Sequence, residues 1–196
     1  MHTGGVIRVT STRLTTANSF EEIYRDGTYL EKNPTWQVED SPWKAQQVHA
    51  LLKRNNITPD TVCEVGCGVG EILVQLSKLM PQGVRFSGYE ITPLAIELAQ
   101  ARATEQISFH LADLITEPTE PFDVVLCIDV IEHVEDYYGF LRGLHPKGTY
   151  TVFHIPLDLS VRSMMSSTRL LNRRASAGHV HYFTPQTALA ALRDTG

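Results

Sequence analysis

Short apolar runs alternate with segments of helical period along most of this chain. Apolar runs of this length, bounded by turn residues, predict buried strands, and they occupy residues 61–65, 84–90, 107–111, 122–128 and 149–155. Apolar residues spaced three or four apart predict helices, and they occupy residues 41–55, 69–79, 93–103, 137–144 and 185–194. Strands that alternate with helices in this order predict an α/β fold with a parallel sheet.

Three of the predicted helices begin at a hydroxyl residue that is followed by proline. The pairs are Ser41-Pro42, Thr92-Pro93 and Thr184-Pro185. A serine or threonine side chain accepts a hydrogen bond from the first helical turn, and proline is tolerated at the first helical position. We therefore expect Ser41, Thr92 and Thr184 to be N-caps.

The segment before the first strand differs in composition. Residues 1–18 are rich in Thr, Ser, Gly and Arg without periodicity, which predicts a flexible arm. Residues 19–56 carry the aromatic side chains Tyr29, Trp36 and Trp43. These rings either cover the edge of the core or form a lid over a cationic ligand, which aromatic faces attract. One domain, residues 19–196, is thus predicted, with a helical lid over 19–56 and an α/β core over 57–196.

Composition and charge exclude several classes of protein. The chain has 196 residues, a net charge of −5 and a pI of about 5.9. Such a chain has no general attraction to nucleic acid, and it has no apolar run that could span a bilayer or act as a signal peptide. Cys63, Cys67 and Cys127 fall in or beside predicted buried strands and match no zinc-site spacing. We expect a cytoplasmic monomer or homodimer with no metal, no nucleic acid and no membrane as partner.

Three glycines at alternate positions follow the first predicted strand. Gly66, Gly68 and Gly70 form a turn into a helix, as at the ligand site of nucleotide-binding sheets. A dinucleotide site needs its third glycine one residue later, where this chain has Glu71, and a carboxylate there would repel phosphate. Glu64 adds a carboxylate at the ligand end of the strand. The spacing favours a nucleoside ligand with a positive charge and no phosphate.

Two segments resemble those of one enzyme family. Residues 64–70 resemble the E/D-x-G-x-G-x-G motif of class I S-adenosylmethionine (SAM)-dependent methyltransferases, and residues 129–134 resemble the D-x-x-E-H-V segment of their small-molecule group. The resemblance covers roughly residues 29–196. It implies a three-layer, Rossmann-like sandwich with a parallel sheet in the order 3-2-1-4-5. It also implies methyl transfer to a small-molecule acceptor, with SAM as cofactor and S-adenosylhomocysteine (SAH) as product.

The sequence departs from this family at its C-terminal end. Class I methyltransferases normally complete the sheet with a hairpin of two more strands, and residues 185–196 leave no room for them. Either the chain is shortened, or the fifth strand has an exposed edge that another chain must cover.

Contacts to SAM are expected where the strands end. A carboxylate at the end of the second strand, here Glu90, can accept hydrogen bonds from both ribose hydroxyls, although chance could also place an acid there. The resemblance implies that Asp113 receives the adenine amino group beside Leu114, although an ordinary turn aspartate fits the same position. Asp129 follows the fourth strand, beside the switch point of the sheet, so it should border the methyl group. The cofactor-binding candidates are Glu64, Gly66, Cys67, Gly68, Gly70, Glu90, Ile91, Asp113, Leu114, Asp129 and Val130.

Basic residues gather downstream of the fifth strand. Between Asp158 and Asp194 the chain has no acidic residue but several arginines and histidines. We infer that Arg173 and Arg174 bind an anionic group of the acceptor, such as that of a sugar nucleotide, with a solvated basic helix as the alternative. Lys44 lies in the first turn of a helix, where a cation is unfavourable. We expect it to be a solvated surface lysine, with a carboxylate partner as the alternative.

Histidine is the usual base near neutral pH, and four histidines are candidates to deprotonate an acceptor hydroxyl. They are His133, His154, His179 and His181. His179 ranks first because it lies on the substrate side. It belongs to a G-H-x-x-x-F-T-P-like stretch that is familiar from the same methyltransferase group and faces the active site there.

Three other classes were weighed against this function. A nucleic-acid methyltransferase conflicts with the negative charge and with the lack of an N-P-P-Y-like tetrapeptide after the fourth strand. A non-catalytic SAM- or nucleotide-binding module is compatible with the acids at the strand ends. A short-chain dehydrogenase conflicts with the glycine spacing and with the lack of a Y-x-x-x-K pair.

Overall fold

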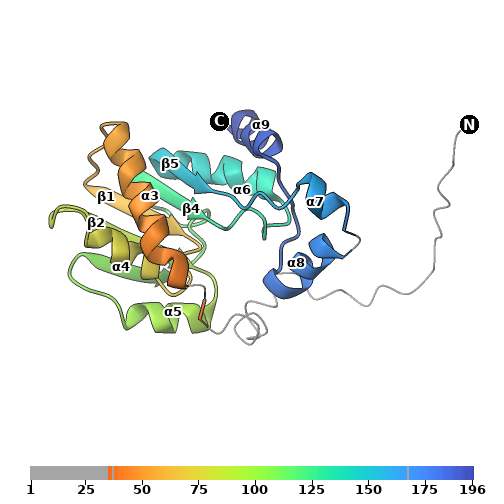
Figure 1. Cartoon of the computed structure of the whole chain (residues 1–196). Helices are drawn as coiled ribbons and strands as arrows, with labels where there is room; N and C mark the ends of the chain where they lie inside the picture. The colour runs from red at the N-terminus through yellow and green to blue at the C-terminus, as the bar shows by residue number, and fades with distance from the viewer. Residues whose placement is uncertain (1–34, 37, 167) are drawn as a thin grey trace, which may run out of the picture.

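The computed structural model describes residues 35–36, 38–166 and 168–196, and this part of the chain contains one five-stranded parallel sheet (Figure 1). The strands lie in the order β3-β2-β1-β4-β5. Their bounds are β1 (Thr61–Val65), β2 (Arg85–Glu90), β3 (Ile107–Leu111), β4 (Phe122–Ile128) and β5 (Gly148–His154). The order and the bounds, which differ from the apolar runs by at most one residue, confirm the fold predicted from the sequence.

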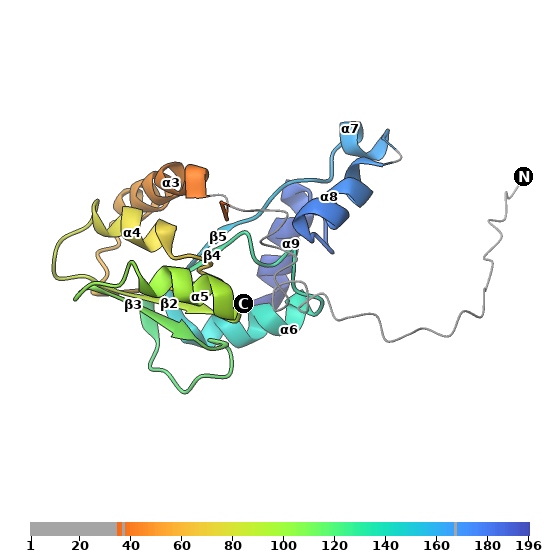
Figure 2. The ribbon, with the colours of Figure 1, turned by 90° about the horizontal axis from the view of Figure 1, so that it is seen from below.

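Helices cover both faces of the sheet and complete a three-layer sandwich (Figures 1 and 2). One face is covered by α3 (Ser41–Arg54), α4 (Glu71–Ser77) and α5 (Pro93–Gln100). The other face is covered by α6 (Tyr137–Leu144) and α9 (Pro185–Thr195). Because both faces are buried, the central strands are apolar on both sides, as is usual for parallel sheets.

The two helical layers bury separate apolar clusters against the sheet. Val62, Val124 and Leu126 point to the side of α3, α4 and α5. Val125 and Cys127 point to the side of α6 and α9, as the two-residue period of a strand requires. All five side chains are buried. Burying each of the larger ones removes apolar surface worth roughly 1.5–3 kcal/mol from water.

Shorter elements connect and extend this sandwich. A 3-10 turn, η1 (Val38–Asp40), leads into α3, and η2 (His145–Lys147) follows α6. After β5 the chain forms α7 (Val161–Met164) and α8 (Arg169–Ala177), which lie past the ends to which β4 and β5 point (Figure 1). Ser160 caps α7: its hydroxyl accepts a hydrogen bond from Ser163 N, and the hydroxyl of Ser163 accepts one from Ser160 N. This extension brings a late part of the sequence to the ligand end of the sheet.

The three predicted N-caps have different outcomes. Thr184 accepts a hydrogen bond from Thr187 N at 3.1 Å and confirms its prediction. Thr92 has the extended backbone of a cap residue, but its side chain makes no capping hydrogen bond. The prediction for Ser41 is wrong, because Ser41 is the first helical residue and Asp40 precedes it. The backbone of Asp40 is already helical, since η1 runs directly into α3.

Cys63, Cys67 and Cys127 are buried free thiols, which confirms the interpretation that they are small apolar residues. Burial raises the pKa of the Cys63 thiol well above its usual range. Among the described helices, none is long and apolar enough to cross a lipid bilayer. The predicted arm over 1–18 and the part of the lid before residue 35, Tyr29 included, lie outside the described residues.

Candidate active site

A pocket of about 520 Å³ opens at the carboxyl ends of the strands. Its walls include the last residue of β2 (Glu90), of β4 (Ile128) and of β5 (His154), together with the loop that follows β1. The neighbouring strands β1 and β4 are followed by crossovers to opposite faces of the sheet, so a crevice opens between their ends. The topology alone therefore predicts a ligand site at this position.

The glycine loop between β1 and α4 forms one wall of the pocket. Gly66 has a φ of +66°, and a Cβ there would lie 2.8 Å from Cγ2 of Val130. Gly70 has a φ of +79°, and a Cβ there would overlap the Phe109 ring. Because Gly66 lines the pocket and carries no side chain, a ligand can approach the main chain there closely, whereas Gly70 lets the loop pack against Phe109.

Two buried carboxylates, Glu90 and Glu64, lie at the strand ends beside this loop. Glu90 accepts hydrogen bonds from Gly68 N at 2.9 Å and from Thr92 N at 2.8 Å, one on each oxygen. Each oxygen keeps a further lone pair that can accept a ligand hydroxyl. Glu64 is buried, its Oε2 has no hydrogen-bond partner among the described residues, and burial raises its pKa well above the usual range. A cationic group in the pocket would satisfy that oxygen.

Asp129, the first residue after β4, has a left-handed backbone with a φ of +54°. Its carboxylate contacts Lys44 Nζ at 2.7 Å and His154 Nδ1 at 2.6 Å. Burial alone would raise the pKa of Asp129, but the hydrogen bonds from these two partners hold it below the usual value. The expectation that Lys44 is a solvated surface lysine is wrong, because only 11% of its side chain is exposed. The alternative, a carboxylate partner, is confirmed, since α3 lies beside the end of β4.

A second aspartate–histidine pair lies on the side of α8. His179 Nδ1 is 2.6 Å from Oδ2 of Asp158, and only 8% of the His179 side chain is exposed. Arg173 of α8 is 3.6 Å from the other oxygen of Asp158. The Nδ1–H of His179 donates to the carboxylate, so the lone pair of its imidazole is on Nε2. The pair is built like the histidine–carboxylate part of a catalytic triad.

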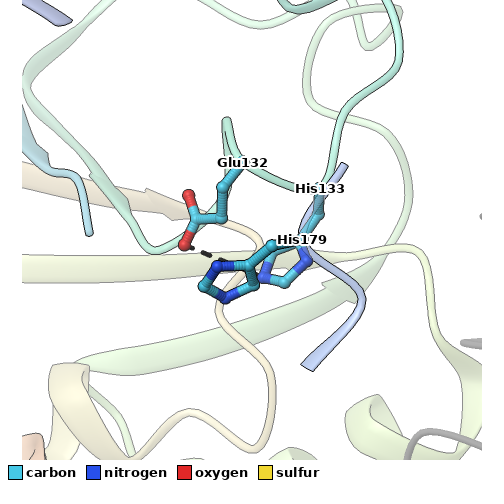
Figure 3. A group of neighbouring side chains, drawn as sticks. All are labelled: Glu132, His133 and His179. Carbon is cyan, nitrogen blue, oxygen red and sulfur yellow. Dashed lines mark ion pairs between the residues drawn. The ribbon is translucent and has the colours of Figure 1, made fainter. Parts of the chain in front are cut away.

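Glu132, His133 and His179 form a cluster in the pocket wall (Figure 3). Glu132 is 1% exposed, and burial raises its pKa to about 8. His133 Nε2 is 3.8 Å from Oε1 of Glu132, and burial lowers the pKa of His133 to about 4. The His133 ring packs edge-on against that of His179, with 4.9 Å between ring centroids. Two segments that are far apart in sequence thus meet here, because the chain after α8 returns to the end of β4.

Carboxyl groups outnumber permanent cations in the described pocket wall. The basic side chains are Lys44 and Arg173, both of which are paired with aspartates. The acidic side chains are Asp40, Glu64, Glu71, Glu90, Asp129, Glu132, Glu135 and Asp158. Even with Glu64 and Glu132 protonated, as their raised pKa values favour, the other carboxylates outnumber the two basic side chains, so the wall favours a cationic ligand and disfavours a dinucleotide diphosphate.

The structure brings most of the predicted residues together but leaves a few apart. Those that line the pocket are Glu64, Gly66, Cys67, Gly68, Glu90, Ile91, Asp129, Val130, His133, His154, Arg173 and His179. Gly70 lies behind the pocket wall and shapes the loop. The remaining four, Asp113, Leu114, Arg174 and His181, are also not among the lining residues.

Each of these four has another setting in the structure. Asp113 is exposed and accepts a hydrogen bond from Ile115 N at 2.9 Å, as an ordinary turn aspartate does. Leu114 is fully buried in the core. His181 Nε2 lies 3.1 Å from the carbonyl oxygen of Glu135. Arg174 is exposed on α8.

Sequence reasoning missed two residues of the site. Neither Asp158 nor Glu132 was a candidate, although Glu132 belongs to the recognised D-x-x-E-H-V segment. No local signal in the sequence identifies Asp158, because its partner His179 lies 21 residues away. Of the predicted lid aromatics, Trp36 and Trp43 line the pocket.

Part of the sequence is similar to curated methyltransferases. Norajmaline N-methyltransferase of Rauvolfia serpentina is 34% identical over 93 residues, which are 44% of this chain and 31% of that protein. Ubiquinone biosynthesis O-methyltransferase of Pseudomonas syringae pv. tomato is 32% identical over 105 residues, which are 50% and 44% of the two chains. The chain thus spans less than half the length of these curated relatives.

A solved structure shares the fold. Magnesium protoporphyrin IX methyltransferase of Synechocystis PCC 6803 with bound SAM has a TM-score of 0.65 and 19% identity, over 93% of this chain and 88% of that one. A model of the methyltransferase domain family matches residues 41–196, which is most of the chain and includes every described element from α3 to α9. The chain therefore belongs to the methyltransferase domain family, as the motifs at residues 64–70 and 129–134 predicted.

Proposed function

We propose that this chain binds SAM and transfers its methyl group to a small-molecule acceptor. The observation that carries the proposal is the carboxyl-rich pocket beside a glycine loop, in which Glu90 is held by two backbone N–H groups and Glu64 has an oxygen without a partner. The ribose hydroxyls of SAM could donate hydrogen bonds to Glu90, and a positively charged group of SAM could pair with Glu64. Membership of the methyltransferase domain family supports the same reaction class.

The cofactor would be held by the predicted residues that line the pocket. Glu90 would accept the ribose hydroxyls, and Ile91 and Val130 offer apolar surface for the adenine. Asp113 and Leu114 remain predicted adenine contacts from the resemblance alone. SAM would supply an electrophilic methyl group on its sulfonium, so the main task of the protein is to position the acceptor in line with it.

His179 is proposed as the base for an acceptor hydroxyl. Asp158 fixes its Nδ1–H, so Nε2 can take the proton of the acceptor while the carboxylate stabilises the imidazolium that forms. Its position in the pocket wall, where only 8% of the side chain is exposed, keeps the base out of bulk water. His154 is more exposed, at 39%, and is engaged with Asp129.

An anionic group of the acceptor is proposed to lie near Arg173. This arginine lines the pocket and reaches toward Asp158 from α8, so it lies on the side of the proposed base. The names of the curated relatives include N- and O-methylation of small molecules. The acceptor class proposed for this chain is accordingly a small molecule with an acidic group.

Calorimetric titration with SAH, with NAD as the control ligand, tests the cofactor. We expect micromolar binding of SAH and no binding of NAD. Glu90→Ala should weaken SAH binding at least tenfold, about 1.4 kcal/mol, because two ribose hydrogen bonds are lost. Glu97→Ala, an exposed residue of α5, is the matched control. Binding of NAD, or unchanged SAH binding in Glu90→Ala, contradicts the proposal.

A further inference from the structure

We propose that Glu132, His133 and His179 form a binding site for a divalent transition-metal ion such as Zn²⁺. One donor atom from each side chain lies within 4.8 Å of the other two. All three side chains face the pocket, and they come from the segment after β4 and the segment after α8 (Figure 3). One carboxylate and two imidazoles suit zinc and its neighbours better than magnesium or calcium, which prefer oxygen ligands.

The carboxylate is the first argument for an ion. Both oxygens of Glu132 are buried and have no hydrogen-bond partner among the described residues. A buried carboxylate without a donor is costly, and native proteins rarely leave one so. A cation bound between Glu132 and the two imidazoles would satisfy it.

The orientation of the two imidazoles is the second argument. His133 Nδ1 is 3.2 Å from the carbonyl oxygen of Gly178, and His179 Nδ1 is 2.6 Å from the carboxylate of Asp158. Because both partners are acceptors, each Nδ1 carries a proton and each Nε2 carries the lone pair that a metal needs. Metal-binding histidines usually donate their second N–H in this way, to a carbonyl or a carboxylate.

The spacing suits an ion after a small movement. Ligand atoms about 2.0–2.1 Å from a tetrahedral zinc are roughly 3.4 Å apart. His133 Nε2 and Glu132 Oε1 are 3.8 Å apart, and the three donor atoms lie within 4.8 Å of one another, so the side chains would move together by up to about 1.4 Å. Three protein ligands leave a fourth position open, as in catalytic zinc sites. Because the three ligands line the pocket, a heteroatom of the acceptor could occupy that position.

This inference rests on the proposed function only for the role of the ion, not for its binding. With an ion present, His179 would be a ligand, and the ion would lower the pKa of a bound hydroxyl so that its proton could pass to water. Without an ion, His179 remains the base. Metal binding is measured without SAM or acceptor, so its failure and that of the proposed function are separate results.

The test is titration of the full chain with Co²⁺, monitored through the visible absorption of four-coordinate cobalt. Zn²⁺ is then added to displace Co²⁺, and its affinity is measured in competition with a chromophoric chelator. We expect one equivalent of each ion to bind, and Mg²⁺ to bind far more weakly. Glu132→Gln and His179→Ala should each weaken Zn²⁺ binding at least a hundredfold. Asp158→Asn, which only orients His179, should weaken it about 10–100-fold.

His110→Ala is the matched control, since His110 is an exposed histidine of β3 outside the cluster. Circular dichroism melting checks that the variants fold, and Zn²⁺ should raise the Tm of the wild-type chain but not that of Glu132→Gln. Absence of Co²⁺ and Zn²⁺ binding overturns the proposal. So does binding that Glu132→Gln and His179→Ala leave unchanged, because the ion is then held elsewhere on the surface.

Discussion

Two aspartate–histidine pairs lie in the same pocket, and the same contact has different surroundings in each. Asp129 pairs with His154 where β4 and β5 end, and Asp158 pairs with His179 beside α8. The distance from Nδ1 to the carboxylate oxygen is 2.6 Å in both. Local geometry therefore does not distinguish them, and the difference must come from their neighbours.

In the first pair, the carboxylate of Asp129 also forms an ion pair with a lysine. Lys44 lies 2.7 Å from Asp129, and His154 is partly exposed with its ring against Trp43. Such a pair is suited to hold α3 and the end of β4 in place around the cofactor part of the pocket.

The second pair lies beside Glu132, a buried carboxylate whose oxygens have no hydrogen-bond partner among the described residues. His179 is buried against His133 and near the carboxylate of Glu132. Arg173, at 3.6 Å, is too far for a hydrogen bond to Asp158. The comparison teaches that the burial of His179 and an unsatisfied carboxylate nearby, rather than the aspartate–histidine contact itself, distinguish the pair that we propose for the reaction.

The largest expected effect separates the two histidines. His179→Ala should lower kcat about 10²–10⁴-fold, because a general base is lost, while the Kd for SAH changes little. His154→Ala is the matched variant and should lower kcat less than about tenfold, since His154 supports Asp129 from a partly exposed position. Steady-state kinetics and SAH calorimetry on both variants provide the measurement. Equal losses of kcat would show that the two pairs do not differ in role.

A smaller effect separates the two arginines of α8. Arg173→Ala should raise KM for an anionic acceptor roughly tenfold, because a charged contact in the pocket is lost, and should leave SAH binding unchanged. Arg174→Ala removes the same charge from the same helix, but Arg174 lies outside the pocket wall. The KM of this variant for the anionic acceptor should therefore stay within about twofold of the wild-type value. An equal rise in both variants would mean that the arginines act through general charge.

The smallest effect is on stability in acid and concerns the first pair. Burial alone would raise the pKa of Asp129, but hydrogen bonds from His154 and Lys44 place it below 3.8 in the folded chain. Ionised Asp129 therefore stabilises the fold above pH 3.8, and this contribution is lost as the pH falls through the lower folded pKa.

Urea unfolding of wild type and Asp129→Asn across this range measures the effect. The difference in unfolding free energy should be constant at higher pH and should narrow on acidification below pH 3.8. Lys44→Met removes one of the two partners of Asp129. The difference in unfolding free energy between wild type and Lys44→Met should therefore narrow less on acidification than the difference between wild type and Asp129→Asn. A difference that does not change with pH would mean that Asp129 titrates alike in the folded and unfolded chains.

The motif-bearing half of the site was predictable from the sequence. The positions of Gly66, Gly68 and Glu90 follow from the end of one strand and the interval to the next, which are local features. The pocket lining confirms that these three residues meet. The position of Ser41 was misjudged because a 3-10 turn leads into α3, and no signal in the pattern marks that turn.

The sequence by itself determined the α/β class, the five strands to within a residue, and the glycine loop that lines the pocket. Apolar periodicity and glycine spacing act over short distances, so a linear pattern is sufficient to read them. Only the tertiary structure decided which aspartate faces which histidine, that Lys44 pairs with Asp129, and that His179 lies against Glu132 and His133. These contacts join segments that are far apart in the sequence and that only the packing of the crossovers brings together. The period of a helix or strand specifies which face is buried, but it does not specify which residue lies across from that face.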